Sequence, residues 1–365
     1  MRARTRAFLI GATGSLAALL GGCGTPPALE GCDPAGGIEP ICGFENPEDL
    51  ALLPGGQWLA VSQMSRGDGP GSLVAWRSSD GAKAALWPGG AVAPAPDWGD
   101  PACPGPPDPQ RFAPHGIDDL RRPMGEPGLL VVNHGGREAV EFFEVGVAAG
   151  RPALFWRGCA VLPPEAWPND VAALPGGRGF VVSKMASQGL GGGPAPGPML
   201  RILLGLPTGF VYAWTPEEGW RQVPGSAGVL PNGVEVSADG SRLFYALSYD
   251  RKIVSQGLDG SQRREVAVDQ GPDNLTWTAD GRLLAAGGAG SSTAAMACQK
   301  VRPAACGVPF AVTAIDPDAM TAVDLVRHDG HSAFGMASVA LPVGDRLYVG
   351  SFQGDRIARV ALPAR

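Results

Sequence analysis

Four oxygen-bearing side chains occupy matching positions in four short segments of this sequence. Glu48, Asn169, Asn232 and Asp273 each lie seven residues before the first residue of a Gly-Gly or Asp-Gly turn, and Asn274 directly follows Asp273. Calcium binds about six to eight carboxylate, amide or carbonyl oxygens, whereas zinc prefers His and Cys. The spacing therefore predicts a calcium site to which separate parts of the chain each contribute a ligand.

Two further carboxylates, Asp49 and Asp170, directly follow Glu48 and Asn169. On an extended strand alternate side chains face opposite sides, so we expect these two to reach a second, deeper ion. A simpler interpretation is that Asn, Asp and Gly only mark turns, as they do in any all-β protein. Four side chains in a common register favour the site over this alternative.

The elements that must position these side chains are hairpins. After each predicted ligand comes a strand-like segment, the turn, and a second apolar run such as 58–61 or 243–247. Two more segments fit less strictly, one from His115 to His134 and one from Met336 to Val349. Hairpins that cannot bury both faces alone must stack, and radial stacking brings equivalent positions to one axis. We therefore predict an all-β, six-bladed β-propeller with calcium in its central tunnel.

Length and composition agree with this fold. Six blades of four strands need roughly 240 to 330 residues, and the chain has 365. Although Gly (55) and Pro (36) are abundant, the 44% hydrophobic content and nine Trp indicate a folded core with many turns. We expect one propeller domain over residues 41–365. The net charge of −6 and the lack of a basic cluster give no support to nucleic-acid binding.

The N-terminus has the features of an export signal. Three arginines within the first six residues precede an apolar stretch from Ala7 to Leu20, and Leu20-Gly21-Gly22-Cys23 matches a bacterial lipobox. We expect a lipoprotein signal peptide over 1–22, lipidation at Cys23, and a tether over 23–40 that holds the protein to a membrane of the cell envelope, on its periplasmic or surface side. The alternative is an ordinary secretory signal with an incidental cysteine. Both interpretations place the protein outside the reducing cytosol.

Six more cysteines follow Cys23, with neither a C-x-x-C pair nor a His spacing suited to zinc. They are Cys32, Cys42, Cys103, Cys159, Cys298 and Cys306. An even number of cysteines in an oxidising compartment points to disulfides, although the sequence leaves all of the roughly 15 pairings open. The short loops favour Cys32 with Cys42 and Cys298 with Cys306, which leaves Cys103 for Cys159.

Several phrases resemble the paraoxonase/arylesterase family, in order, over about residues 41 to 362. They are Glu45-Asn46-Pro47-Glu48-Asp49-Leu50, Pro114-His115-Gly116-Ile117, Val131-Val132-Asn133-His134, Pro168-Asn169-Asp170-Val171, Pro231-Asn232-Gly233-Val234 and Asp273-Asn274-Leu275. The chain is more distantly similar to gluconolactonase-like six-bladed propellers, which share the metal positions without the two histidines.

The paraoxonase resemblance implies two calcium ions and hydrolysis of small-molecule lactones and aryl esters. We expect the protein to be a monomer. It implies that the catalytic ion is held by Glu48, Asn169, Asn232, Asp273 and Asn274, and the structural ion by Asp49, Asp170 and the backbone oxygens of Leu50 and Ile117. His115 and His134 match the proposed histidine dyad. Since calcium acidifies water less than zinc does, we expect His115, oriented by His134, to act as general base, a role that Glu48 or Asp273 could share.

The chain departs from the family in two places. The last residues, 360–365, contain no cysteine, so we expect strand pairing alone to close the ring. The insert 189–206, rich in Gly and Pro and then in apolar residues, stands where the family has an aromatic-rich active-site helix. It could roof an apolar pocket, contact a lipid surface near Cys23, or pack as a buried loop on the propeller rim.

Two other function classes remain open on the sequence. One is a non-catalytic, calcium-stabilised propeller that acts as a binding module at the cell envelope. The other is a redox propeller with a quinone cofactor, which predicts a cluster of Arg or Lys that the expected tunnel positions lack. No Gly-x-Ser-x-Gly motif supports a serine hydrolase. His328 and His331 lie in a polar loop and receive no role.

Overall fold

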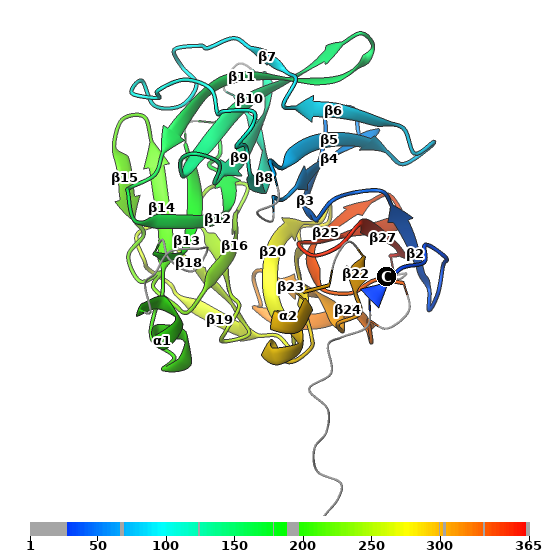
Figure 1. Cartoon of the computed structure of the whole chain (residues 1–365). Helices are drawn as coiled ribbons and strands as arrows, with labels where there is room; N and C mark the ends of the chain where they lie inside the picture. Colours follow the sequence, from blue (N-terminus) through cyan, green and yellow to red (C-terminus); the bar gives the residue numbers. More distant parts are fainter. Residues whose placement is uncertain are drawn as a thin grey trace, which may run out of the picture.

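The structure is a computed structural model, and the residues it describes are 28–65, 69–122, 125–177, 179–187, 197–298, 300–301, 304–330 and 333–362. The predicted signal peptide over 1–22, the lipidation site Cys23 and His331 lie outside the described residues. Within them, strands form six blades around a common axis (Figure 1). The predicted all-β, six-bladed propeller is therefore confirmed.

Each blade is an antiparallel sheet of four strands, and one blade gains β7 as a fifth strand that runs parallel to β11. From the innermost strand outward, three blades are β3 (Pro47–Leu52), β4 (Trp58–Gln63), β5 (Ser72–Arg77), β6 (Lys83–Trp87); β8 (Pro114–Arg121), β9 (Pro127–Asn133), β10 (Ala139–Ala148), β11 (Arg151–Val161), β7 (Ala91–Val92); and β12 (Ala166–Ala173), β13 (Phe180–Ser187), β14 (Phe210–Thr215), β15 (Gly219–Gln222). The other three are β16 (Pro231–Val236), β17 (Leu243–Leu247), β18 (Lys252–Gln256), β19 (Arg264–Ala267); β20 (Gly271–Trp277), β21 (Leu283–Gly288), β23 (Phe310–Asp316), β24 (Thr321–His328); and β25 (Ala337–Val343), β26 (Arg346–Ser351), β27 (Arg356–Ala361), β2 (Ile38–Cys42).

The innermost strands β3, β8, β12, β16, β20 and β25 surround the tunnel. Each contacts the next, and β25 contacts β3, which completes the ring. The hydrophobic core lies mainly between neighbouring blades. Trp87 of one blade, for example, packs in the same buried cluster as Phe143 and Trp156 of the next. Because every blade buries its faces against two neighbours, the starts of the innermost strands are held rigidly around the axis.

Strand pairing closes the ring, as expected from the missing late cysteine. β2 forms the outer strand of the last blade by pairing with β27, from Ile38 opposite Val360 to Cys42 opposite Arg356. A two-residue strand, β1 (Ala28–Leu29), pairs with β22 (Ala305–Cys306), and the buried Arg356 donates a hydrogen bond to the backbone oxygen of Leu29. Residues 28 to 42, most of which we assigned to a tether, thus find partners in the folded body.

All six cysteines form the disulfides that the short loops favour. The pairs are Cys32–Cys42, Cys103–Cys159 and Cys298–Cys306. Three disulfides are typical of proteins that fold outside the cytosol.

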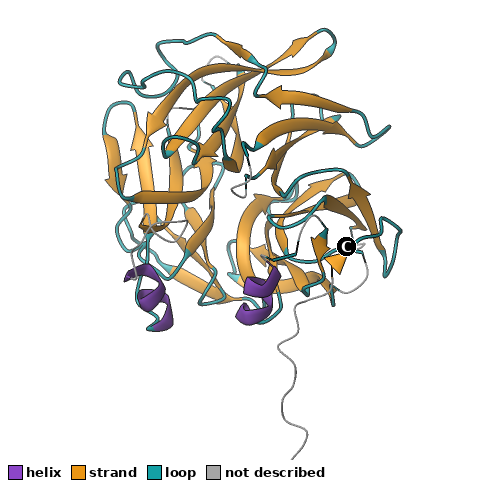
Figure 2. Cartoon of the chain, in the orientation of Figure 1, coloured by secondary structure: helices purple, strands orange, loops and turns teal. Residues whose placement is uncertain are grey.

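Two short helices interrupt the described strands (Figure 2), namely α1 (Gly197–Leu203) and α2 (Ser292–Cys298). α1 belongs to the insert 189–206. Leu203, at the end of α1, is 72% exposed, and Leu204, which follows it, is 61% exposed. Among the described residues, no helix has the length and apolar character that crossing a membrane requires. These exposed leucines do not agree with the interpretation that this part of the insert packs as a buried loop on the propeller rim.

Candidate metal centre and histidine pair

A β-bulge occurs in every innermost strand, at the predicted ligands or at their counterparts. Between Pro231 and Val234, for example, two residues of β16 oppose one residue of β17. The same shift occurs in β3, β8, β12, β20 and β25. In five of these strands a proline directly precedes the bulged residues: Pro47, Pro114, Pro168, Pro231 and Pro272. Bulges redirect side chains and proline is tolerated where a strand starts, so this local sequence turns the polar side chains toward the tunnel.

The bulges bring neighbouring residues to one place. Asp273 and Asn274 are consecutive, and strict alternation would point them to opposite sides. In the bulge both reach the centre: Asn274 Nδ2 donates to Glu48 Oε1 at 2.8 Å, and the Asn232 side chain hydrogen-bonds Asp273. Residues more than 200 positions apart therefore meet at the axis.

Glycines allow the innermost strands to approach one another. A Cβ on Gly116 would lie 2.4 Å from Asp170 Oδ1, and a Cβ on Gly233 would lie 2.4 Å from the backbone oxygen of Asp273. Since real side chains do not tolerate such distances, both glycines are required where one bulge packs against the next. They are the residues that follow His115 and Asn232.

Four of the predicted ligands carry a buried oxygen that has no hydrogen-bond partner. These atoms are Glu48 Oε2, Asn169 Oδ1, Asn232 Oδ1 and Asn274 Oδ1. An unsatisfied buried acceptor costs about 1–3 kcal/mol, so four around one axis indicate a missing positive partner. The donors are hard carboxylate and amide oxygens, which fit calcium. Across the described ranges, no group of three or more His, Cys, Asp or Glu side chains is placed to hold a metal. This centre does not form such a group because most of its acceptor oxygens belong to asparagines.

Burial disfavours the ionised carboxylates of this centre. Burial, reinforced by Asp49 and Asp273, raises the pKa of Glu48 well above its ordinary value. Burial also raises the pKa of Asp273 to about 7, against a hydrogen bond from Asn232 that lowers it. A bound cation would reverse both shifts because it favours the charged form.

The carboxylates predicted for the deeper ion have backbone partners instead of orphaned oxygens. Asp49 accepts hydrogen bonds from the N–H groups of Leu50 at 2.8 Å and Ile117 at 2.7 Å. Asp170 accepts them from Val171 and Val234, both at 2.8 Å. Each carboxylate thus links its own strand to the next blade. Burial raises the pKa of Asp49 to about 7.

Two more acidic side chains belong to the same stretch of tunnel and were missed by the sequence analysis. Asp118 Oδ2 accepts a hydrogen bond from the N–H of Ala173 at 2.7 Å, which repeats the link to the next blade. Burial and then Asp118 raise the pKa of Glu235 well above its ordinary value. Asp118 in β8 and Glu235 in β16 both follow the bulged residues of their strands. That position was the only feature of the sequence that could have indicated a place in the tunnel.

The two predicted histidines form a hydrogen-bonded pair. His115 Nδ1 lies 2.8 Å from His134 Nε2, and His134 Nδ1 lies 2.6 Å from Glu138 Oε2. On the other side, His115 Nε2 lies 3.7 Å from Glu48 Oε1 and 3.5 Å from Asn169 Nδ2. The Glu138 carboxylate, the His134 ring, the His115 ring and the candidate metal centre therefore form a continuous chain of contacts. Glu138 was not predicted, and its only signal was its position four residues after His134.

The hydrogen-bond partners assign the tautomers of the pair. The Glu138 carboxylate can only accept, so His134 Nδ1 carries the proton and His134 Nε2 accepts from His115 Nδ1. His115 Nε2 is then left without a proton and faces the metal centre. Burial, followed by the proximity of His134, lowers the pKa of His115 well below 6.5, which keeps the ring neutral.

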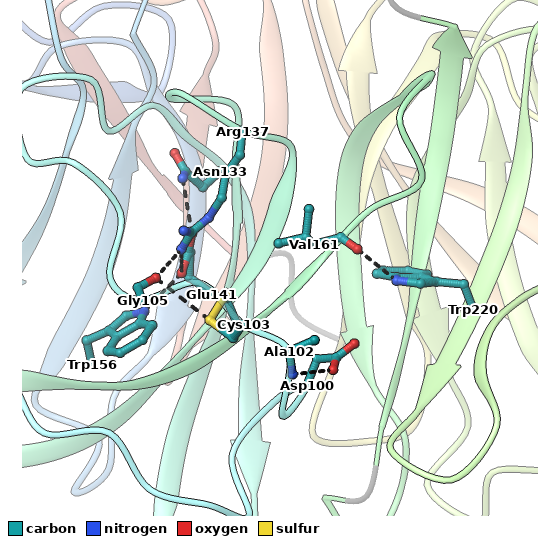
Figure 3. Close-up of a disulfide and its surroundings, with 11 residues drawn as sticks. Asp100, Ala102, Cys103, Gly105, Asn133, Arg137, Glu141, Trp156, Val161 and Trp220 are labelled. Carbon is teal, nitrogen blue, oxygen red and sulfur yellow. Dashed lines mark hydrogen bonds and ion pairs between the residues drawn. A yellow bond between two sulfur atoms is a disulfide. The ribbon is translucent and has the colours of Figure 1, made fainter.

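A buried polar network fixes the hairpin that carries His134 and Glu138 (Figure 3). Glu141, at 0% exposure, accepts hydrogen bonds from Asn133, Arg137 and Trp156. Arg137 also donates to the backbone oxygen of Gly105, in the loop that the Cys103–Cys159 disulfide ties to β11. Since these contacts surround both ends of the β9–β10 turn, the position of the histidine pair is set by the fold.

No protein-family model and no curated protein matches the sequence. Among solved structures the chain is similar to a luciferin-regenerating enzyme, with a TM-score of 0.53, 15% identity, and coverage of 89% of this chain and 94% of that chain. A gluconolactonase from Xanthomonas campestris gives a TM-score of 0.53, 17% identity and 89% coverage of both chains.

A PQQ-bound aldose sugar dehydrogenase from Streptomyces coelicolor gives a TM-score of 0.51 and 16% identity, covering 93% of this chain and 100% of that chain. At these identities the similarities establish the six-bladed fold, which hydrolases and a redox enzyme share. The resemblance to paraoxonases therefore rests on the sequence motifs alone.

Proposed function

We propose that this protein is a calcium-dependent hydrolase of lactones and aryl esters. One observation carries the proposal: His115 Nε2, the nitrogen that the tautomer assignment leaves without a proton, faces the buried centre where four oxygens lack partners. A neutral base beside a cation site is the combination that ester hydrolysis needs at neutral pH. The gluconolactonase that shares the fold is consistent with lactone hydrolysis.

The residues that would hold the catalytic ion are Glu48, Asn169, Asn232, Asp273 and Asn274. Bound there, calcium would polarise the ester carbonyl and stabilise the negative charge that develops on its oxygen. Asp49 and Asp170, with the backbone oxygens of Leu50 and Ile117, would hold a structural ion deeper in the tunnel. That second site has weaker support, since its carboxylate oxygens already accept N–H bonds.

His115 would act as the general base. Its Nε2 accepts a proton from the attacking water while its Nδ1–H stays hydrogen-bonded to His134. The Glu138 carboxylate holds His134 in the tautomer that makes this possible and stabilises the positive charge that appears on the pair. Because His115 is only 8% exposed, bulk water does not compete for its base nitrogen.

We further propose that the mature protein is a lipoprotein anchored through Cys23 to a bacterial cell-envelope membrane. Only four residues separate Cys23 from β1, which begins at Ala28. A lipid on Cys23 would therefore hold the body close to the membrane. The exposed Leu203 and Leu204 of the insert offer apolar surface for such a bilayer. Mass spectrometry of membrane-fraction protein should find an acylated N-terminal cysteine, and an unmodified soluble N-terminus would contradict it.

The hydrolase is tested by assaying a panel of lactones and aryl esters with calcium and with a chelator, alongside the calcium content of the protein. Calcium-dependent turnover is the expected result. Stoichiometric calcium without turnover on any substrate would instead favour the binding module. Turnover that is unaffected by complete calcium removal would contradict the role of the metal.

A further inference from the structure

A cavity of about 220 Å³ adjoins the candidate metal centre, and His115 is not among its lining residues. Asn232 and Asp273 form part of its wall, together with the β17–β18 turn and α2. This volume is below the roughly 300–1,000 Å³ that is usual for drug-sized ligands. A substrate whose carbonyl group sits at the metal centre would place the rest of a small ring here.

Arg251 is the basic side chain in this wall. It lies in the β17–β18 turn with a φ of 52°, and its Nη1 donates to the backbone oxygen of Asp269 at 2.7 Å. That bond orients the exposed guanidinium but neutralises no charge. Among the described residues, no carboxylate forms an ion pair with Arg251, whereas the neighbouring Lys252 pairs with Glu265 and Arg327 pairs with Asp269.

The rest of the cavity wall carries little charge. Its other polar side chains are mainly hydroxyls, such as Ser248 and Ser291, and among the described residues that line it Asp273, a predicted metal ligand, is the only carboxylate. With calcium bound, Asp273 would not compete for Arg251, so the field in the cavity would be positive. A guanidinium retains several N–H donors after one bond and matches a carboxylate with two parallel hydrogen bonds.

The part of the wall that α2 contributes is held in place covalently. Ala295 of α2 contributes to it, and α2 ends at Cys298, which is bonded to Cys306. β22 in turn pairs with β1. A site whose walls are fixed in this way loses little conformational entropy when a ligand binds.

We propose that this cavity selects substrates that carry a carboxylate, which Arg251 binds while the ester or lactone carbonyl lies at the metal centre. This inference rests on the proposed hydrolase function for the position of the carbonyl. It narrows the substrate class to small lactones or esters with an anionic substituent close to the reacting group. The specificity would then be electrostatic and would weaken as salt increases.

The test compares 5-oxotetrahydrofuran-2-carboxylate with its carboxamide, which has nearly the same shape and no charge. We expect wild type to prefer the carboxylate by about tenfold or more in kcat/KM, and Arg251→Gln to lose about 10- to 100-fold on the carboxylate alone. Arg251→Lys should recover part of this loss. Lys252→Gln is the matched control because it removes a neighbouring charge outside the cavity wall, and its activity on both substrates should stay near wild type.

Binding of the product 2-hydroxyglutarate, measured by calorimetry with calcium present, separates this inference from the proposed function. If neither lactone is cleaved but 2-hydroxyglutarate binds wild type and not Arg251→Gln, the hydrolase proposal fails and the anion site stands. If both lactones are cleaved equally well, and Arg251→Gln changes neither turnover nor 2-hydroxyglutarate binding, the anion site is overturned. Thermal unfolding of each variant checks that the fold is intact.

Discussion

His115→Gln is the most direct test of the chemistry at this site. Glutamine keeps a hydrogen-bonding side chain of similar size but cannot take up a proton at neutral pH. We expect kcat to fall by about 10²- to 10⁴-fold, the usual contribution of a general base. Calcium binding should survive, because the unpartnered oxygens that would hold the ion belong to other residues. His115 only lies beside them, with its Nε2 3.7 Å from Glu48 Oε1.

The pH profile adds a second, independent readout. His115 acts as a base only when it is neutral, and burial together with His134 places its pKa well below 6.5. Bound calcium would lower this pKa further, in the same direction. In wild type, kcat/KM should therefore stay on its plateau as the pH falls to 6.5 and decline only when the pH passes through the lowered pKa. His115→Gln should lack this acidic decline.

The assay measures kcat on a lactone and an aryl ester, with calcium content determined for the same samples. His328→Gln is the control: His328 stacks on Phe310 at the outer strand β24, so its loss should leave turnover near wild type. If His115→Gln retains full activity on both substrates, the histidine pair has no catalytic role, and the centre must activate water through its carboxylates. If His115→Gln loses calcium, His115 contributes to metal binding, and its assignment as a base that is not a calcium ligand is wrong.

Three further predictions concern the groups around His115. Glu138→Gln, which permits the other His134 tautomer, should lower kcat by about tenfold or more while KM and calcium content, measured on the same protein, stay near wild type. Asn232→Ala should abolish calcium-dependent turnover and reduce calcium affinity in a titration. In chelated protein, the pKa values of about 7 for Asp49 and Asp273 exceed the unfolded value of 3.8, so the folded state binds more protons. Its melting temperature should fall as the pH rises from about 5 to 8, and calcium should remove this trend.

Much of the fold was readable in the sequence because its signals are local and repeated. A strand, a two-residue turn and a second strand recur with the same spacing after Glu48, Asn169, Asn232 and Asp273, and repetition of one unit predicts radial stacking. The disulfides were readable in part, since short loops favoured two of the three pairs and left Cys103 for Cys159. The predicted ligands and His115 also follow from register, because equivalent residues of a repeat meet at the axis.

What only the tertiary structure decided are the contacts between blades and the geometry inside each strand. Strict alternation pointed Asp49 and Asp170 away from the first centre, but it could not show that these carboxylates accept hydrogen bonds from N–H groups of the next blade. No local pattern could pair Glu138 with His134, or show that no carboxylate among the described residues pairs with Arg251. Such relations depend on which residues fold next to one another, and that is set by packing across the whole ring.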